Sequence, residues 1–172
     1  TFLRSMQWSE WSPKGKELFS ALRAPGVGES IVLDENQFLE RSLANGIQRK
    51  LSAADRAAYY APYATAASRR PLLQWTREIP IEGEPADVAA IVERYDAWLS
   101  ASADVPKLLL AFDSPPGLQP SPTGSPATIS WAREHVSHLE LRPLGVAAHH
   151  APEDRPTEIG QAIQEWLERQ RL

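Results

Sequence analysis

One apolar segment limits the possible folds more than any other. Residues 105–112, VPKLLLAF, form an almost continuous apolar run bounded by prolines. Such a run predicts a strand buried on both faces, which is typical of a parallel sheet covered by helices. A second, weaker strand is predicted at 138–145, HLELRPLG, and an amphipathic helix at 157–172. We therefore expect an α/β fold in which residues 103–172 form a C-terminal βαβα unit.

The residues before this unit are predicted to be mostly helical. Residues 13–23 carry apolar side chains at helical spacing, and Pro71 stands in the first turn of another helix. Ser52, followed three residues later by Asp55, predicts a capped helix start. An extended stretch is expected at IVLD, followed by a short helix with Phe38 and Leu39 inward.

The strongest helical pattern covers residues 84–102. One face of this helix collects its large apolar side chains, which predicts burial. These residues are Val88, Ile91, Val92, Tyr95, Trp98 and Leu99. In the last helix, Ile159, Ile163, Trp166 and Leu167 are likewise expected to face inward. We interpret residues 1–102 as a helical cap region with its helical return to the core.

Composition excludes several classes of function. The net charge of −4, without a basic stripe, argues against nucleic-acid binding. With zero cysteines, disulfides, thiolate catalysis and cysteine zinc sites are excluded. No apolar run approaches the roughly 18 residues that span a bilayer, and the first residues lack the apolar region of a signal peptide. We expect a cytoplasmic protein, and because the chain starts without Met, we expect its natural N-terminus to be missing.

Two adjacent histidines follow the second predicted strand. They lie in a loop of small residues, GVAAHH at 145–150, ahead of an acidic pair and the last helix. A polar surface loop explains them on its own, since loops lie on surfaces. The alternative is a catalytic base, because α/β-hydrolases carry their histidine in the loop after the last strand.

Several stretches together resemble the C-terminal half of haloalkane dehalogenases, which are α/β-hydrolases, and of the coelenterazine luciferases related to them. The block SRRPLLQWTREIPIEGEP is the most specific. The full set is FLRSM at 2–6, WSEW at 8–11, KELFSALRAPGVGE at 16–29, VLDENQFLERSL at 32–43, LSAADRAAYYAPY at 51–63, SRRPLLQWTREIPIEGEPADVAAIVERYDAWL at 68–99, VPKLLL at 105–110 and EDRPTEIGQAIQEWL at 153–167. The resemblance implies an α/β-hydrolase fold, in its C-terminal portion, with a helical cap.

The resemblance also implies an activity, the hydrolysis of carbon–halogen bonds in small halogenated organic substrates. In that family an aspartate displaces the halide and forms an alkyl-enzyme ester, which a histidine-activated water then hydrolyses. No cofactor and no metal is implied. Positioning, a dry pocket and a donor for the departing anion are sufficient for such chemistry.

The resemblance assigns roles residue by residue. The pattern H-x-x-x-E-D, which ends at Glu153 and Asp154, selects His149 as the catalytic base. His150 then stands where the family usually has an aromatic side chain that lines the substrate pocket. Cap positions that line the same pocket correspond to Phe19, Leu22 and Phe38, although ordinary core packing explains these three equally well.

The acidic partner of the base is less well defined. Many members carry a glutamate just ahead of the segment that matches FLR, and here that position is Thr1. Other members carry the acid after the next strand, which makes Asp113 the candidate. Its alternative role is a turn-forming aspartate before Ser-Pro-Pro.

The nucleophile is absent from these 172 residues, since neither G-x-D-x-x-G nor G-x-S-x-G occurs. Two strands are also too few for a covered parallel sheet. We therefore expect a fragment that needs an N-terminal half or a partner chain, and that is inactive alone. A non-catalytic binding or assembly module is the alternative function, and a luciferase-type oxygenase is a weaker one.

Overall fold

A computed structural model of the chain describes residues 4–120 and 124–171. The chain divides into two compact units. The first contains the described residues up to Arg41 together with Leu51–Ala97, and the second contains Ser42–Lys50 and the described residues from Trp98 onward.

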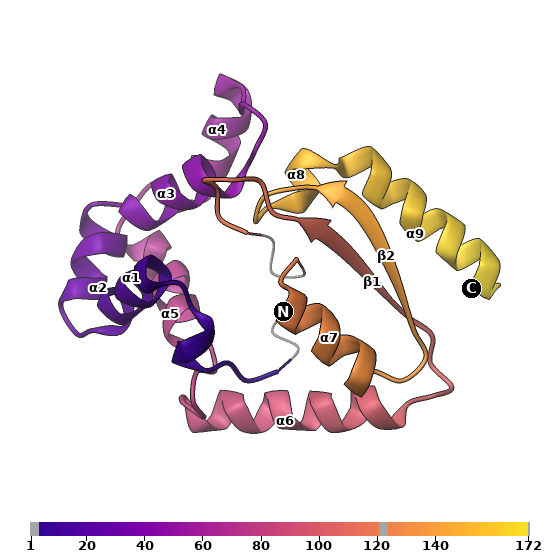
Figure 1. Cartoon of the computed structure of the whole chain (residues 1–172). Helices are drawn as coiled ribbons and strands as arrows, with labels where there is room; N and C mark the ends of the chain where they lie inside the picture. Colours follow the sequence, from indigo (N-terminus) through magenta and orange to yellow (C-terminus); the bar gives the residue numbers. More distant parts are fainter. Residues whose placement is uncertain (1–3, 121–123, 172) are drawn as a thin grey trace. The chain divides into compact units, whose positions relative to one another are not determined.

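Helices make up most of the first unit (Figure 1). In chain order they are α1 (Pro13–Arg23), α2 (Val27–Glu29), α3 (Gln37–Gly46, which continues into the second unit), α4 (Ala53–Tyr60), α5 (Arg70–Arg77) and α6 (Ala86–Ala101, which also continues). Short 3-10 turns lie at Trp8–Glu10, Ala61–Tyr63 and Ala67–Arg69.

Local sequence explains where these helices begin. The Ser52 hydroxyl accepts a hydrogen bond from the Asp55 amide at 3.1 Å, and the Asp55 carboxylate accepts one from the Ser52 amide. This reciprocal pair is the predicted capping box of α4. Proline occupies the first turn of both α1 and α5, where its missing N–H is not needed.

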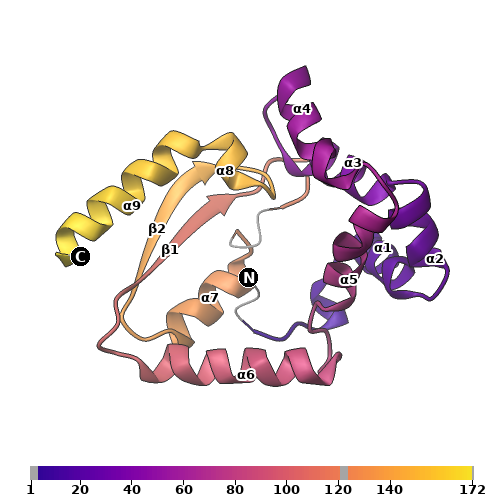
Figure 2. The same cartoon turned by 180° about the vertical axis from the view of Figure 1, so that it is seen from behind.

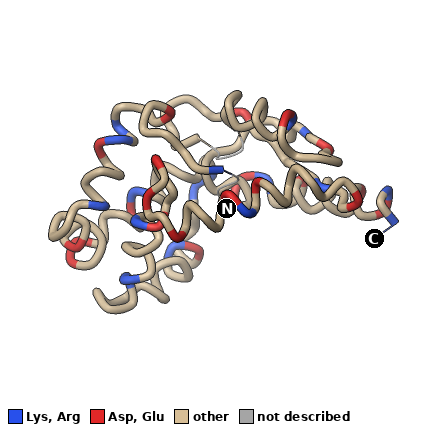
Figure 3. The backbone as a smooth tube through the Cα atoms, turned by 90° about the horizontal axis from the view of Figure 1, so that it is seen from below, with Lys and Arg blue, Asp and Glu red and all other residues tan. Residues whose placement is uncertain are grey.

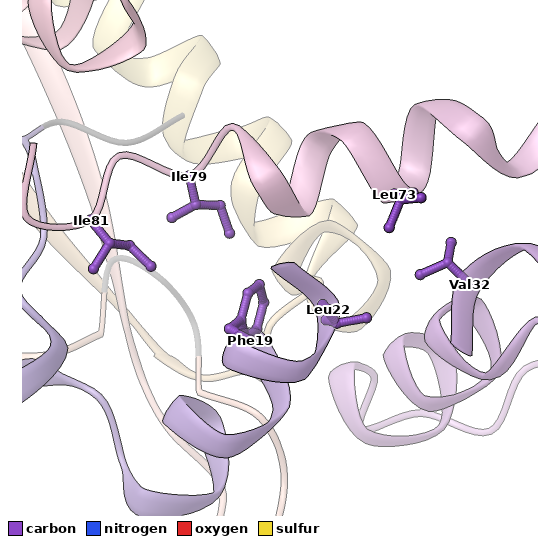
Figure 4. Close-up of a cluster of buried hydrophobic side chains, with 6 residues drawn as sticks. All are labelled: Phe19, Leu22, Val32, Leu73, Ile79 and Ile81. Carbon is purple, nitrogen blue, oxygen red and sulfur yellow. The ribbon is translucent and has the colours of Figure 1, made fainter. Parts of the chain in front are cut away.

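The core of the first unit joins α1, α5, the segment after α5 and the π-helical turn Ser30–Asp34. Its buried side chains are Phe19, Leu22, Val32, Leu73, Ile79 and Ile81 (Figure 4). Leu22 and Val32 are fully buried, with 0% of their surface exposed. Burying side chains of this size contributes about 1.5–3 kcal/mol each, so this cluster stabilises the unit.

The prediction of an extended stretch at IVLD is wrong. Residues Ser30–Asp34 form a single π-helical turn, here called η2, directly after α2. The guanidinium of Arg69, only 9% exposed, donates through Nε to the Leu33 carbonyl at 2.9 Å. Its Nη1 donates to the Tyr63 carbonyl at 2.9 Å. A helical turn whose Leu33 carbonyl accepts from Arg69 therefore stands in place of the extended stretch that β-branched residues favour.

The second unit contains a parallel βαβα arrangement, which confirms the α/β class. Strand β1 (Lys107–Asp113) pairs in parallel with β2 (Leu139–Val146). The pairing runs from Lys107 beside Leu139 to Asp113 beside Val146. Helix α7 (Pro126–His135) connects the strands, and α8 (Ala151–Asp154) and α9 (Pro156–Gln170) follow. In Figures 1 and 2, α7 and α9 lie on opposite faces of the strand pair.

Much of the predicted apolar surface is not covered. On α6, Ala89 and Val92 are buried, whereas Tyr95 is 50% exposed and Trp98 is 52% exposed. On α9, Ala162 is buried but Ile163 is 40% exposed and Leu167 36%. The inward orientation expected for these large side chains is thus wrong in this chain. On α9 the physical reason is that the sheet of the described residues has two strands, which is too narrow to cover the whole apolar face of the helix.

No helix in the described ranges is long and apolar enough to cross a membrane. Both acidic and basic residues are distributed along the described chain (Figure 3). This distribution matches the small net charge of −4.

Candidate functional site

The two histidines lie in the loop between β2 and α8, inside the second unit. Two fully buried residues, Ala147 and Ala148, precede them. The Ala147 amide donates to the carbonyl of Asp113 at 3.1 Å, so the loop is fixed at the ends of both strands. A small side chain is required at Ala147 because a larger one would have to enter its packed contact with Phe112 and Ala151.

His149 is half-buried and contacts the loop that follows β1. Its Nδ1 lies 3.2 Å from the carbonyl oxygen of Pro120. A carbonyl only accepts, so Nδ1 must carry the proton, and Nε2 of the neutral ring keeps a free lone pair. Burial lowers the pKa of His149 below its usual 6.5, and the Pro120 contact acts in the opposite direction. The ring is therefore neutral near pH 7 and suited to accept a proton through Nε2.

His150 is held by the end of α3. Its amide donates to the Gly46 carbonyl at 2.7 Å. Its ring nitrogen Nε2 lies 2.9 Å from the Ser42 hydroxyl. Burial lowers the pKa of His150, while Glu153 and Asp154 oppose that shift. The two imidazoles meet edge to face, with centroids 5.1 Å apart.

The acidic pair after the histidines holds the loop in place. One Asp154 carboxylate oxygen accepts from the amides of Gln48 and Arg49, at 2.8 and 3.0 Å. The other accepts from the Ala148 amide at 2.9 Å. Glu153 forms an ion pair with Arg49. The two carboxylates thus join the histidine loop to residues 48–49.

Asp113 ends β1 and its side chain is exposed. Within the described residues, its carboxylate makes no hydrogen bond with His149, whose Nδ1 contacts Pro120 instead. The structure therefore does not bring the candidate acid and the base together in this chain. The other position considered, Thr1, lies outside the described residues.

The candidate pocket residues of the cap are in or beside the core of the first unit. Phe19 is 8% exposed and Leu22 is 0% exposed, both inside the buried cluster of Figure 4. Phe38 packs on the edge of that cluster, 6.3 Å from the Trp75 ring. An open hollow of about 480 Å³ in this unit is lined by Glu29, Leu33, Arg70, Pro71, Leu73 and Gln74. None of the candidate residues lines it.

Sequence reasoning missed three residues that contact the histidine pair. Ser42 and Gly46 come from α3, and Pro120 comes from the loop after β1. The proline-rich loop carried no signal for a specific carbonyl. The only available signal for the other two was their small size on one side of α3, four residues apart.

Similarity to known proteins identifies relatives of this chain. No protein-family model matches the chain. A haloalkane dehalogenase from Mesorhizobium japonicum is 40% identical, in an alignment that covers 96% of this chain and 52% of the relative. Another, from Sphingobium indicum, is 38% identical over 96% of this chain and 53% of its own length. The chain is a homologue of haloalkane dehalogenases.

Solved structures agree with this homology. A haloalkane dehalogenase from Bradyrhizobium elkani is 41% identical, with a TM-score of 0.84 over 95% of this chain and 55% of that one. One from Agrobacterium tumefaciens C58 is 32% identical, also with a TM-score of 0.84, over 96% of this chain and 55% of that one. The α/β-hydrolase fold predicted from the resemblance is confirmed. This dehalogenase homologue spans about half the length of the curated relatives it matches, which fits the predicted C-terminal half.

Proposed function

We propose that this chain is the half of a haloalkane dehalogenase-type hydrolase that bears the cap and the base, with His149 as the base. The observation that supports the proposal best is the hydrogen bonding and burial of the His149 ring. Its Nδ1 contacts a carbonyl at 3.2 Å and its pKa is lowered by burial, so Nε2 is available as a proton acceptor. The homologous proteins are named haloalkane dehalogenases, which supports the reaction class.

In the proposed reaction, a carboxylate outside this chain attacks the carbon that bears the halogen. The carbon–halogen bond breaks and the halide leaves with its electron pair, which gives an alkyl ester. His149 Nε2 then takes a proton from water as the oxygen of that water attacks the ester carbonyl. Alcohol is released, the carboxylate is regenerated, and the proton leaves the imidazolium to solvent.

The remaining site residues belong to the same proposal. Asp113 is the proposed acid that stabilises the imidazolium, a role that requires its exposed carboxylate to approach the ring once the fold is complete. Phe19, Leu22, Phe38 and His150 are the proposed pocket residues, and the substrate is a small halogenated organic compound. The proposed partner is an N-terminal half, or another chain, that completes the sheet beside β1 and β2.

Halide release tests the proposal. The purified chain is assayed with a 1-bromoalkane, alone and after co-expression with the other half of its Mesorhizobium japonicum relative; that half alone is the control. We expect repeated turnover, with many equivalents of bromide, from the pair and from neither half, because forming the ester needs the nucleophile of the other half and hydrolysing it needs His149. Bromide release by this chain alone would contradict the account, as would a stable complex of the two halves without turnover.

A further inference from the structure

The end of α3 and the histidine loop form a defined structure that we call the histidine seat, made of Ser42, Gly46 and His150. We propose that Ser42 and Gly46 are positioning residues that hold the His150 ring against His149, so that protonation of either ring opposes protonation of the other. The proposal goes beyond the reaction above, because it concerns the titration of this chain and can fail or succeed independently of dehalogenation.

Three contacts fix His150 in the seat. The Ser42 hydroxyl lies 2.9 Å from Nε2, and the Gly46 carbonyl accepts the His150 amide at 2.7 Å. A Cβ atom at Gly46 would lie 2.7 Å from Cδ2 of His150, so the ring occupies the space that any other residue there would fill. The backbone, one ring edge and one ring nitrogen of His150 are all held by a single helix end.

The position of His150 determines what it does to its neighbour. The two ring centroids are 5.1 Å apart and the planes meet at 86°. Two unit charges at this separation repel even in the fully aqueous limit, where Coulomb's law gives a shift of about 0.6 in a titration midpoint. Partial burial of both rings strengthens this repulsion, so the doubly charged state is disfavoured.

The charged groups around the pair do not cancel this effect. Glu153 and Asp154 of α8 favour a charge on His150. Glu153 is paired with Arg49, and Asp154 accepts three backbone amides, so both carboxylates have other partners. On the opposite side, His149 meets the uncharged carbonyl of Pro120.

The test is the titration midpoint of His149 in the full chain, measured by hydrogen–deuterium exchange at imidazole C2 with fragment-ion mass spectrometry. His150→Phe keeps the ring and removes its charge, and we expect the His149 midpoint to rise by about 0.6 or more. Ser42→Ala, which releases the ring, should raise it by part of that amount. Ser42→Thr, which keeps the hydroxyl, should restore the wild-type value.

Two glycine variants provide a further test and its control. Gly46→Ala places a methyl group against His150 and should raise the His149 midpoint as Ser42→Ala does. Gly160→Ala, in α9, meets nothing within 4 Å and should leave the midpoint unchanged. An unchanged His149 midpoint in His150→Phe would overturn the coupling. Equal midpoints in wild type, Ser42→Ala and Gly46→Ala would overturn the positioning role, even if those variants lose stability.

Discussion

At the residue scale, Glu153 and Asp154 matter in two ways. Their spacing from His149 matches the family pattern that selects this histidine, and in the structure their carboxylates hold the histidine loop. Asp154 matters more, because it accepts three backbone amides from two distant segments. A charged acceptor for several amides is worth more than a surface ion pair such as Glu153 with Arg49.

We predict that Asp154→Ala lowers the free energy of unfolding by about 2 kcal/mol, because the Ala148 amide loses its acceptor in a part-buried site. Asp104→Ala, at an exposed position before β1, is the control and should change it by less than about 0.5 kcal/mol. Urea unfolding followed by tryptophan fluorescence measures both. Equal losses in the two variants would show that Asp154 does not anchor the loop.

Only part of the candidate site could be predicted from sequence. His149 follows from its loop and its spacing to two acidic residues, which are local features. Ser42 lies 108 residues away from its partner His150. A hydroxyl on a helix face is compatible with many environments, so nothing local distinguishes this serine from an exposed one.

At the element scale, helix starts were predictable because caps and prolines act locally. Ser52 and Pro71 mark the observed starts of α4 and α5. The π-helical turn η2 was not predictable, because its Leu33 carbonyl is satisfied by Arg69, a residue 36 positions away. The covered faces of α6 and α9 were predicted correctly only in part: Val92 is buried and Ile159 packs on a buried cluster, whereas other large side chains of the same faces are exposed. Periodicity shows which face is apolar but not whether a partner covers it.

Arg69 gives the element-scale prediction. Its buried guanidinium bridges the carbonyls of Leu33 and Tyr63, so we predict that Arg69→Ala lowers the unfolding free energy by about 2–4 kcal/mol. Arg69→Lys should recover less than half of the loss, because an ammonium group lacks the planar fork. The neighbouring exposed Arg70→Ala is the control. If Arg69→Lys melts at the wild-type temperature, the bridge is not what stabilises η2.

At the scale of the whole molecule, several large apolar side chains of the described residues are partly exposed to solvent. Exposed side chains include Tyr95 and Trp98 on α6 and Ile163 and Leu167 on α9. The chain also spans only about half of its curated relatives. Two strands leave unpaired edge groups, which natural sheets cover or pair. Both features fit a molecule that is completed by additional strands.

We therefore predict that the isolated chain self-associates, and that co-expression with a matching N-terminal half converts it into a one-to-one complex. Sedimentation velocity measures both states. The apolar surface on α6 and α9 is the proposed cause, so Trp98→Lys together with Leu167→Lys should reduce association of the chain and weaken the complex. A monodisperse monomer with a single cooperative melt would contradict this prediction.

The central claim is that His149 acts on the ester and not on the step that forms it. The decisive measurement is the mass of the nucleophile-bearing half, with the bromide count, after His149→Ala in the completed enzyme is mixed with a 1-bromoalkane. The account predicts one equivalent of bromide and a stable alkyl adduct, whereas Asp113→Asn should only slow the loss of that adduct. Continued full turnover by His149→Ala, with no adduct, would contradict the account.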